Sequence, residues 1–210
     1  MKNWRRPTLI KIVTVCGSPV SGSSTELLLK RIGDSLVGEL GLKCHRTFVY
    51  LNELNITPCQ ACGEDPTPAG CFIDDDMTTL YPKLMTCDCL LFGSPIYFDS
   101  MSAQGKLFID RCNCLRPANF ANPNAGDGFV RRIHHHRPSA IVLVGGNKAW
   151  FEGARRPIAG YFKWLGVSNE ATLIFSNNDI NNRIGTVVDH PKVLAEADRI
   201  GQMLARKIRE

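Results

Sequence analysis

Apolar positions along this chain alternate between two spacings, and the alternation predicts strands and helices in turn. Short, β-branched apolar runs predict buried strands, the first of them over 9–15. Between these runs, apolar residues recur three and four positions apart, as they do on one face of a helix. The other strands are predicted over 43–50, 89–93, 140–144 and 172–175, and the helices over 24–40, 77–85, 101–112, 151–165 and 193–208.

Strands and helices in alternation predict an α/β fold, because parallel strands are joined by crossover helices. We expect three layers, α/β/α, around a five-stranded parallel sheet in the order 2-1-3-4-5. The length of 210 residues suits one domain over 1–210. Its irregular parts are predicted to be an N-terminal tail (1–8), a cysteine-containing loop (51–76) and a long loop (113–138).

The segment between the first strand and the first helix has the character of an anion site. It reads Cys16-Gly17-Ser18-Pro19-Val20-Ser21-Gly22-Ser23-Ser24-Thr25, with small or hydroxyl-bearing side chains and no acid. Ser23 can cap the helix, and Glu26 can complete a capping box. Because a helix N-terminus attracts negative charge, a phosphate is the expected ligand.

Three known kinds of phosphate loop fit this segment poorly. A nucleotide P-loop needs a lysine before the hydroxyl residues at the helix start, and none is present. A dinucleotide fingerprint needs three spaced glycines, which Gly17 and Gly22 do not supply. A cysteine phosphatase, with Cys16 as nucleophile, needs an arginine where Gly22 stands. What remains is a loop that holds a terminal phosphate by neutral donors, or an ordinary turn between strand and helix.

Two further segments are predicted to leave the sheet at the same edge. Residues 93–100 follow the third strand, and residues 145–150 follow the fourth. Sheets of this order bind ligands at the carboxyl ends of their strands, where the order reverses between the first and third strands. The three loops are therefore predicted to surround one site.

Charge and composition narrow the classes of partner. The net charge of +5 is spread along the chain without a basic block, so we expect no nucleic-acid partner. No run of 18 apolar residues occurs, so we expect no membrane partner. The basic residues 1–7 precede no apolar signal core, which favours a cytoplasmic protein. The nine cysteines, an odd number, are expected to be metal ligands or small core residues.

Three sequence motifs, two in the predicted loops and one in the helix predicted over 101–112, resemble those of one family. The runs 16–25, Gly93-Ser94-Pro95-Ile96-Tyr97-Phe98 and 102–111 are similar to the NADPH-dependent FMN reductase family. The nearest branch is that of the iron–sulfur flavoproteins, because Cys59, Cys62 and Cys71 precede Asp74-Asp75-Asp76-Met77 as cysteines do there. The resemblance implies a flavodoxin-like fold, FMN as cofactor and NAD(P)H as co-substrate.

The resemblance also implies a role for each loop residue. The FMN phosphate would be bound by Ser18, Ser23, Ser24 and Thr25. The ribityl chain and isoalloxazine ring would lie along Ser94, Pro95, Ile96, Tyr97 and Phe98, and the third flavin loop would consist of Gly145, Gly146 and Asn147. Because the flavin carries the reaction, no catalytic residue is assigned.

The implied activity is hydride transfer from a nicotinamide to FMN and on to a flavin, a quinone or another small acceptor. The alternative is an electron carrier of the iron–sulfur flavoprotein type, which relays electrons between partner proteins without substrate turnover of its own. The electron partner is accordingly a small molecule or a redox protein. The resemblance further implies a homodimer or homotetramer.

The chain departs from the family pattern at three places. Val20 stands where an arginine is usual, which removes a charged phosphate contact, and Gly105 stands where a larger apolar residue is usual. The cysteine loop has Asp65 at its third cysteine position. Cys59, Cys62 and Cys71 could hold an iron–sulfur cluster or zinc together with a carboxylate, or the loop could hold no metal.

Overall fold

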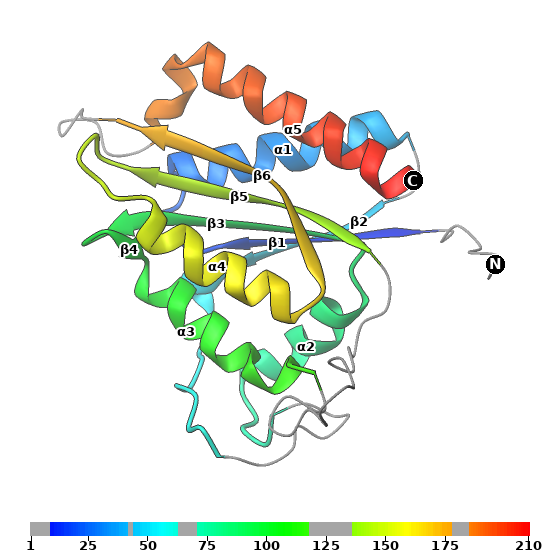
Figure 1. The fold of residues 1–210 in the computed structure, drawn as a ribbon, viewed down its shortest axis with the longest axis vertical. Coiled ribbons are helices and arrows are strands. Elements are labelled where there is room, and N and C mark those ends of the chain that lie inside the picture. Colours follow the sequence, from blue (N-terminus) through cyan, green and yellow to red (C-terminus); the bar gives the residue numbers. More distant parts are fainter. Residues whose placement is uncertain (1–8, 42–43, 63–70, 118–135, 178–184) are drawn as a thin grey trace, which may run out of the picture.

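The computed structural model describes residues 9–41, 44–62, 71–117, 136–177 and 185–210. A parallel sheet lies between two layers of helices (Figure 1). The strands are β1 (Ile10–Cys16), β2 (Cys44–Tyr50), β3 (Cys89–Tyr97), β4 (Ser100–Met101), β5 (Arg137–Gly145) and β6 (Val167–Ser176). The α-helices are α1 (Ser24–Leu40), α2 (Asp76–Thr86), α3 (Ala103–Arg111), α4 (Glu152–Trp164) and α5 (Pro191–Arg209). Three 3₁₀ turns are η1 (Leu51–Glu53), η2 (Cys112–Leu115) and η3 (Thr186–Asp189).

The strand order is β2-β1-β3-β5-β6, and each pair of neighbours is parallel. β5 and β6 are the predicted fourth and fifth strands, because the short β4 pairs only with β3 and is not one of the five parallel strands. The order therefore confirms the predicted 2-1-3-4-5 arrangement. β4 pairs antiparallel with the end of β3, where Ile96 lies opposite Met101. The sequence pattern did not predict this short hairpin, because a two-residue strand has no periodicity to detect.

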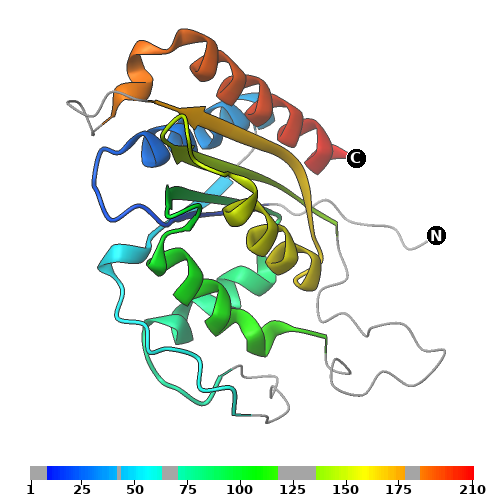
Figure 2. The same cartoon turned by 60° about the vertical axis from the view of Figure 1, so that its left-hand side comes forward.

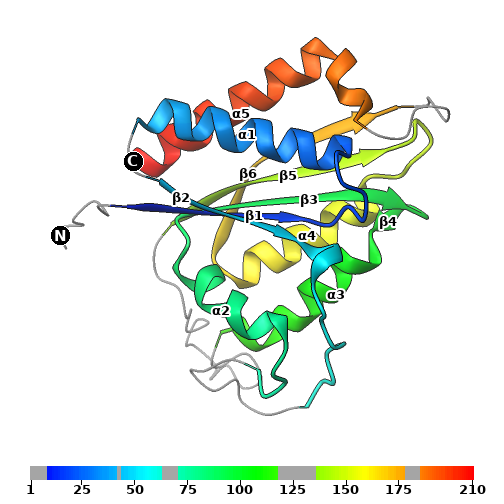
Figure 3. The same cartoon turned by 180° about the vertical axis from the view of Figure 1, so that it is seen from behind.

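The helices divide between the two faces of the sheet (Figures 1 and 3). α1 and α5 cover one face, and α2, α3 and α4 cover the other, so each face buries its own apolar core. Leu90 and Phe92 of β3 point into the second core, whereas Cys89 and Leu91 point into the first. Cover on both faces explains why the central strands are almost wholly apolar.

Three strands extend well beyond their predicted limits, and one of them, β5, begins at Arg137 instead of 140. β3 continues to Tyr97 instead of ending at 93, because Ser94 and Pro95 pair with Leu143 and Val144 of β5. β6 begins at Val167 instead of 172. Its first half is polar and lies at the edge of the sheet, so the apolar run alone marked only its second half.

The start of α1 follows the prediction in part. The Ser23 side chain accepts the Glu26 N–H at 3.3 Å, which confirms Ser23 as the N-cap. The Glu26 carboxylate reaches the Gly22 N–H at 2.8 Å, one residue before the partner that a capping box requires. Gly41 ends the helix in the left-handed conformation, with φ of 57°.

α2 is the helix predicted over 77–85, and Pro82 lies inside it without ending it. Its N-cap is Asp75, whose side chain accepts the Met77 N–H at 3.0 Å while Thr78 Oγ1 accepts the Asp75 N–H at 3.3 Å.

Among the described helices, none is both long and apolar enough to cross a membrane.

Candidate functional site

Three loops at the carboxyl edge of the sheet lie next to one another (Figure 2). The loop before α1 is tied to β3 by a hydrogen bond from the Gly17 N–H to the Gly93 carbonyl oxygen, at 2.8 Å. The loop after β5 packs on β3, because a Cβ at Gly145 would lie 3.1 Å from the Cβ of Ile96. The fold therefore brings together the three segments that the sequence predicted to surround one site.

Backbone N–H groups at the start of α1 form the anion-binding part of this edge. The N–H groups of Ser23, Ser24 and Thr25 donate no hydrogen bond within the part of the chain that the structure describes. Two nearby N–H groups are occupied, since Val20 donates to Ser18 Oγ at 3.2 Å and Gly22 donates to the Glu26 carboxylate at 2.8 Å. Unpaired N–H groups at the positive end of a helix dipole suit a phosphate.

Three of the four hydroxyl groups predicted to bind the phosphate, those of Ser18, Ser23 and Ser24, have other partners. Ser18 Oγ accepts the Val20 N–H, and Ser23 Oγ caps α1. Ser24 Oγ accepts the Val187 N–H at 3.1 Å, which fastens η3 to the start of α1. These hydroxyls shape the loop in the structure, and their direct contact with a ligand stays a prediction.

The segment around η3 is a wall of this site that the sequence reasoning missed. Thr186 Oγ1 lies 3.5 Å from Ser24 Oγ and accepts a hydrogen bond from Asn177 Nδ2 at 2.7 Å. A Cβ at Gly185 would lie 3.1 Å from the Gly22 carbonyl oxygen. The only hint in the sequence was a polar, Asn-rich stretch after the last strand, which resembles an ordinary loop.

A buried carboxylate lies behind the anion site. Glu26 accepts hydrogen bonds from the Gly22 N–H, from Lys30 Nζ at 2.6 Å and from the Tyr50 hydroxyl at 3.0 Å. Burial alone would raise the pKa of Glu26, but these donors outweigh it and hold the pKa below its usual value. Glu26 is therefore an ionised, paired group, and Lys30 offsets its charge beside the loop.

The end of β3 places two aromatic side chains at the open edge. Tyr97 is 47 % exposed, and Phe98 is fully exposed at the tip of the β3–β4 hairpin. Pro95 and Ile96 are half-buried beneath them. Ser94 is completely buried, and its hydroxyl oxygen accepts the N–H of Ser102 at 2.9 Å. The side chain of Ser94 thus serves the start of α3, and its assignment to the ribityl chain stays a prediction.

The loop after β5 supplies backbone and one large side chain. Gly146 is exposed, and a Cβ there would have no neighbour within 4 Å, so its backbone faces open space. Asn147 is exposed beside it. Trp150, which the sequence reasoning did not assign to the site, has a side chain that is 60 % exposed. Its backbone N–H donates to Asp99 Oδ1 at 2.8 Å.

Gly105 departs from the usual pattern for a packing reason. A Cβ at this position would lie 3.2 Å from Ser102 Oγ and 3.6 Å from the Phe92 ring, at the tightly packed start of α3. The Gly105 N–H also donates to Ser102 Oγ at 3.1 Å. A larger side chain would therefore displace the cap that Ser102 gives to α3.

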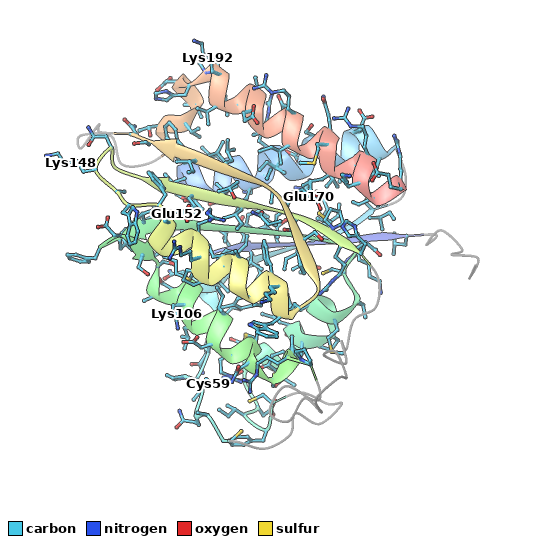
Figure 4. The ribbon with its side chains drawn as sticks, viewed as in Figure 1. Cys59, Lys106, Lys148, Glu152, Glu170 and Lys192 are labelled. Carbon is cyan, nitrogen blue, oxygen red and sulfur yellow. The ribbon has the colours of Figure 1, made fainter. Side chains whose placement is uncertain are left out.

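The cysteines predicted as metal ligands lie in three different surroundings. Cys59 is half-buried on the outer side of α3 (Figure 4) and lines a cavity of about 420 Å³ between the cysteine loop, α3 and α4. Cys62 is exposed, and Cys71 packs with Cys114 against the apolar core beneath α2 and α3. In the described residues, no three His, Cys, Asp or Glu side chains form a group that could hold a metal ion. A metal at these cysteines therefore stays a prediction, and Asp65, at the third cysteine position, lies outside the described residues.

A buried ion pair closes the neck of the cysteine loop. The Arg111 guanidinium pairs with the Asp75 carboxylate and donates to the Thr57 carbonyl oxygen at 2.6 Å and the Ile73 carbonyl oxygen at 3.4 Å. Burial alone would raise the pKa of Asp75, but Arg111 and the N–H groups of Thr57 and Met77 hold it below its usual value. One arginine thus joins both described ends of the loop.

Burial makes Cys16 a poor nucleophile. Its side chain is 1 % exposed at the end of β1, and burial raises its pKa to about 11. A cysteine phosphatase needs a thiolate near neutral pH, so this alternative lacks its reactive group. Cys87, Cys89 and Cys112 are buried as well and fill the core.

FMN fits the carboxyl edge on two counts. Unpaired N–H groups at the start of α1 suit its phosphate, and the half-buried and exposed apolar side chains from Ile96 to Phe98 suit its ring. Val20 is 40 % exposed and adds no charge there, so the backbone provides the attraction for the phosphate.

Comparison with known proteins assigns the chain to a family. The iron-sulfur flavoprotein of Methanosarcina thermophila is 29 % identical over 194 residues, which cover 91 % of this chain and 87 % of that protein. A flavone reductase structure has a TM-score of 0.67 at 16 % identity, covering 96 % of this chain and 64 % of that one. An archaeal flavodoxin has a TM-score of 0.53 at 15 % identity, covering 96 % of this chain and all of that one, so the fold is flavodoxin-like. The model of the NADPH-dependent FMN reductase family matches residues 10–174, and this chain belongs to that family.

Proposed function

We propose that the chain is an FMN-binding, NAD(P)H-dependent oxidoreductase that passes electrons to a flavin, a quinone or another small acceptor. The observation that carries the proposal is the row of unpaired N–H groups at Ser23, Ser24 and Thr25, next to the apolar end of β3. This pairing of an anion site with an aromatic wall suits a cofactor that has a phosphate at one end and a flat ring at the other.

Each part of the site has a physical role in this proposal. The N–H groups at the start of α1 bind the phosphate, with Ser18 and Ser23 holding the loop in shape. Ile96, Tyr97 and Gly146 border the ring and exclude water from one of its faces. When bound, FMN would accept and donate the hydride, so the protein contributes orientation and the polarity around the ring.

A comparison of two flavins tests the binding. FMN and riboflavin share the ring, but only FMN has the phosphate. Purified chain should bind FMN about 100-fold or more tightly than riboflavin, measured by quenching of flavin fluorescence, because charge-assisted hydrogen bonds from N–H groups are strong. Equal affinities, or no binding of FMN at high micromolar concentration, would contradict the proposal.

Steady-state oxidation of NADPH then separates an enzyme from an electron carrier. An FMN-loaded enzyme should oxidise NADPH repeatedly with a small quinone or free flavin as acceptor. A carrier between redox proteins should bind FMN but turn over barely at all with these acceptors. Turnover with NADH and with several acceptors in the same assay would define the co-substrate and the acceptor class.

Location and assembly belong to the same proposal. We propose a cytoplasmic homodimer or homotetramer, and exposed apolar side chains such as Phe72 and Val188 support an association between copies. Light scattering of the FMN-loaded chain measures the oligomeric state, and a monomer at all concentrations would contradict it.

A further inference from the structure

The tip of the β3–β4 hairpin has an unusual backbone. Phe98 and Asp99 both have left-handed φ angles, 48° and 58°, and an aromatic residue such as Phe98 rarely adopts one. Two such residues in succession match the turn that joins a two-residue hairpin, where Asn and Gly are the usual choice. Strained residues of this kind persist where the surroundings hold them, and they cluster at functional sites.

Two contacts hold the tip against the start of α4. Asp99 Oδ1 accepts the N–H of Trp150 at 2.8 Å. At Gly153, a Cβ would lie 1.8 Å from the Asp99 carbonyl oxygen, so only glycine allows the tip to approach this closely. The hairpin and the loop after β5 are therefore joined at their outer ends, beyond the strands that carry them.

This joint presents Trp150 at the outer rim of the proposed flavin site. The indole packs near Gly153, 3.7 Å from where its Cβ would lie, and the side chain is 60 % exposed. Trp150 follows Gly146 and Asn147 in the chain, and its backbone N–H is bonded to Asp99 at the hairpin tip, two residues past the end of β3. An exposed indole at this position can contact a flat ring that arrives from solvent.

We propose that Trp150 contacts the nicotinamide ring of the arriving NAD(P)H, and that Asp99 is the positioning residue that holds it there. The inference rests on the proposed function. It assigns a specificity-determining side chain to the co-substrate and leaves FMN to the inner segments. Two other uses of Trp150, as a wall for the flavin or as a contact between copies, become outcomes of the test.

The first experiment separates the co-substrate from the cofactor. In FMN-loaded chain, Trp150→Ala should raise the KM for NADPH about three- to tenfold, because one aromatic contact is lost. Trp150→Phe keeps an aromatic ring, so its KM for NADPH should stay close to that of wild type. In both variants the Kd for FMN should stay within about twofold of wild type. Titration of the oxidised, FMN-loaded chain with NADP⁺, followed by the visible spectrum, should show the same loss without any turnover.

A second series tests Asp99. Asp99→Asn keeps both the acceptor oxygen and the tolerance for a left-handed φ, so it should behave as wild type. Asp99→Gly keeps the turn but loses the acceptor, so its KM for NADPH should rise as in Trp150→Ala. In the chain without cofactor, the Trp150 amide should exchange its hydrogen faster in Asp99→Gly than in wild type or Asp99→Asn.

A matched pair of helix variants tests the close approach. Gly153→Ala should force the tip away and raise the KM for NADPH, whereas Gly160→Ala, on the same helix with no neighbour within 4 Å, should leave the KM unchanged. Three results in Trp150→Ala would each overturn the inference. They are an unchanged KM for NADPH, a higher Kd for FMN in place of a higher KM, and dissociation of an oligomer. Failure of wild type to bind FMN would overturn the proposed function itself, and that result appears before any variant is compared.

Discussion

Two of the loops that the sequence marked as functional, the one before α1 and the cysteine loop, satisfy their polar groups in opposite ways. At the start of α1, the N–H groups of Ser23, Ser24 and Thr25 have no partner in the described part of the chain. At the neck of the cysteine loop, Arg111 and Asp75 bond to each other and to the backbone on both sides. One loop has donors to spare for a ligand, and the other has its charges matched internally.

This difference separates binding from structure. Helix-terminal N–H groups without partners are a place where an anion adds hydrogen bonds that the protein alone does not make. A paired guanidinium and carboxylate, both nearly fully buried, neutralise each other's charge, although the buried Nε of Arg111 has no hydrogen-bond partner. The first loop therefore has open N–H groups that an anion could pair, whereas the charges at the neck of the second are already paired with each other.

The largest effect is expected at the neck. Arg111→Met would leave the Asp75 carboxylate buried without its partner and should lower the free energy of unfolding by about 3–5 kcal/mol, measured by urea denaturation. Lys106→Met is the matched control, because Lys106 forms an exposed pair with Asp110 on the same helix. The control should cost less than about 0.5 kcal/mol. A loss below about 1 kcal/mol in Arg111→Met would show that the ion pair does not hold the loop.

At the anion site, two changes of Ser23 should separate affinity from stability. Ser23→Asp keeps a good N-cap but adds a negative charge beside the phosphate, so the Kd for FMN should rise about 100-fold or more. Ser23→Ala keeps the site neutral but loses the cap, so the free energy of unfolding should fall by about 1 kcal/mol. Fluorescence titration and urea denaturation measure the two quantities. If both variants lower stability and affinity together, the open N–H groups are not the phosphate site.

The sequence predicted those parts of the fold in which burial requires a regular pattern of apolar residues. β1, β3 and β5 are covered on both faces, and their apolar runs revealed their places in the chain, whereas the strand order was predicted from the alternation of strands and helices. β6 lies at an edge, so its polar first half was missed. The β3–β4 hairpin was missed because its turn uses Phe98 and Asp99 in place of the Asn and Gly that signal such a turn.

At the candidate site, the sequence predicted segments better than atomic roles. The three loops converge because parallel strands end at one edge, which follows from the fold. Which group offers a hydrogen bond depends on contacts between distant residues, such as Val187 with Ser24 or Asp99 with Trp150. No periodicity or motif reveals these pairings, so the sequence predicted N–H groups and hydroxyls alike as donors, and three of the hydroxyls turn out to have partners within the protein.

The neck of the cysteine loop should also respond to acid. Because the pKa of Asp75 is lower in the folded chain than in the unfolded one, its contribution is complete above the unfolded pKa and is lost as pH falls through the folded pKa. The stability difference between wild type and Asp75→Asn should therefore be constant near neutral pH and shrink as pH falls below about 4. Urea denaturation at a series of pH values measures it, and a difference that persists at low pH would contradict the assignment.

The smallest effect is expected on removal of metal. If Arg111 and Asp75 close the cysteine loop, a chelator should leave the Tm of anaerobically purified chain within about 1 °C, because no metal bond is needed to join the two ends. Asp75→Asn makes this test more sensitive, because it removes the ion pair with Arg111. If a metal also joined the two ends of the loop, its removal would lower the Tm of this variant more than that of wild type. Iron and sulfide analysis of the same samples shows whether a cluster was there to remove. Iron bound in stoichiometric amount, together with a fall in Tm on chelation, would mean that the thiols regroup around a metal and that both loops are completed by ligands.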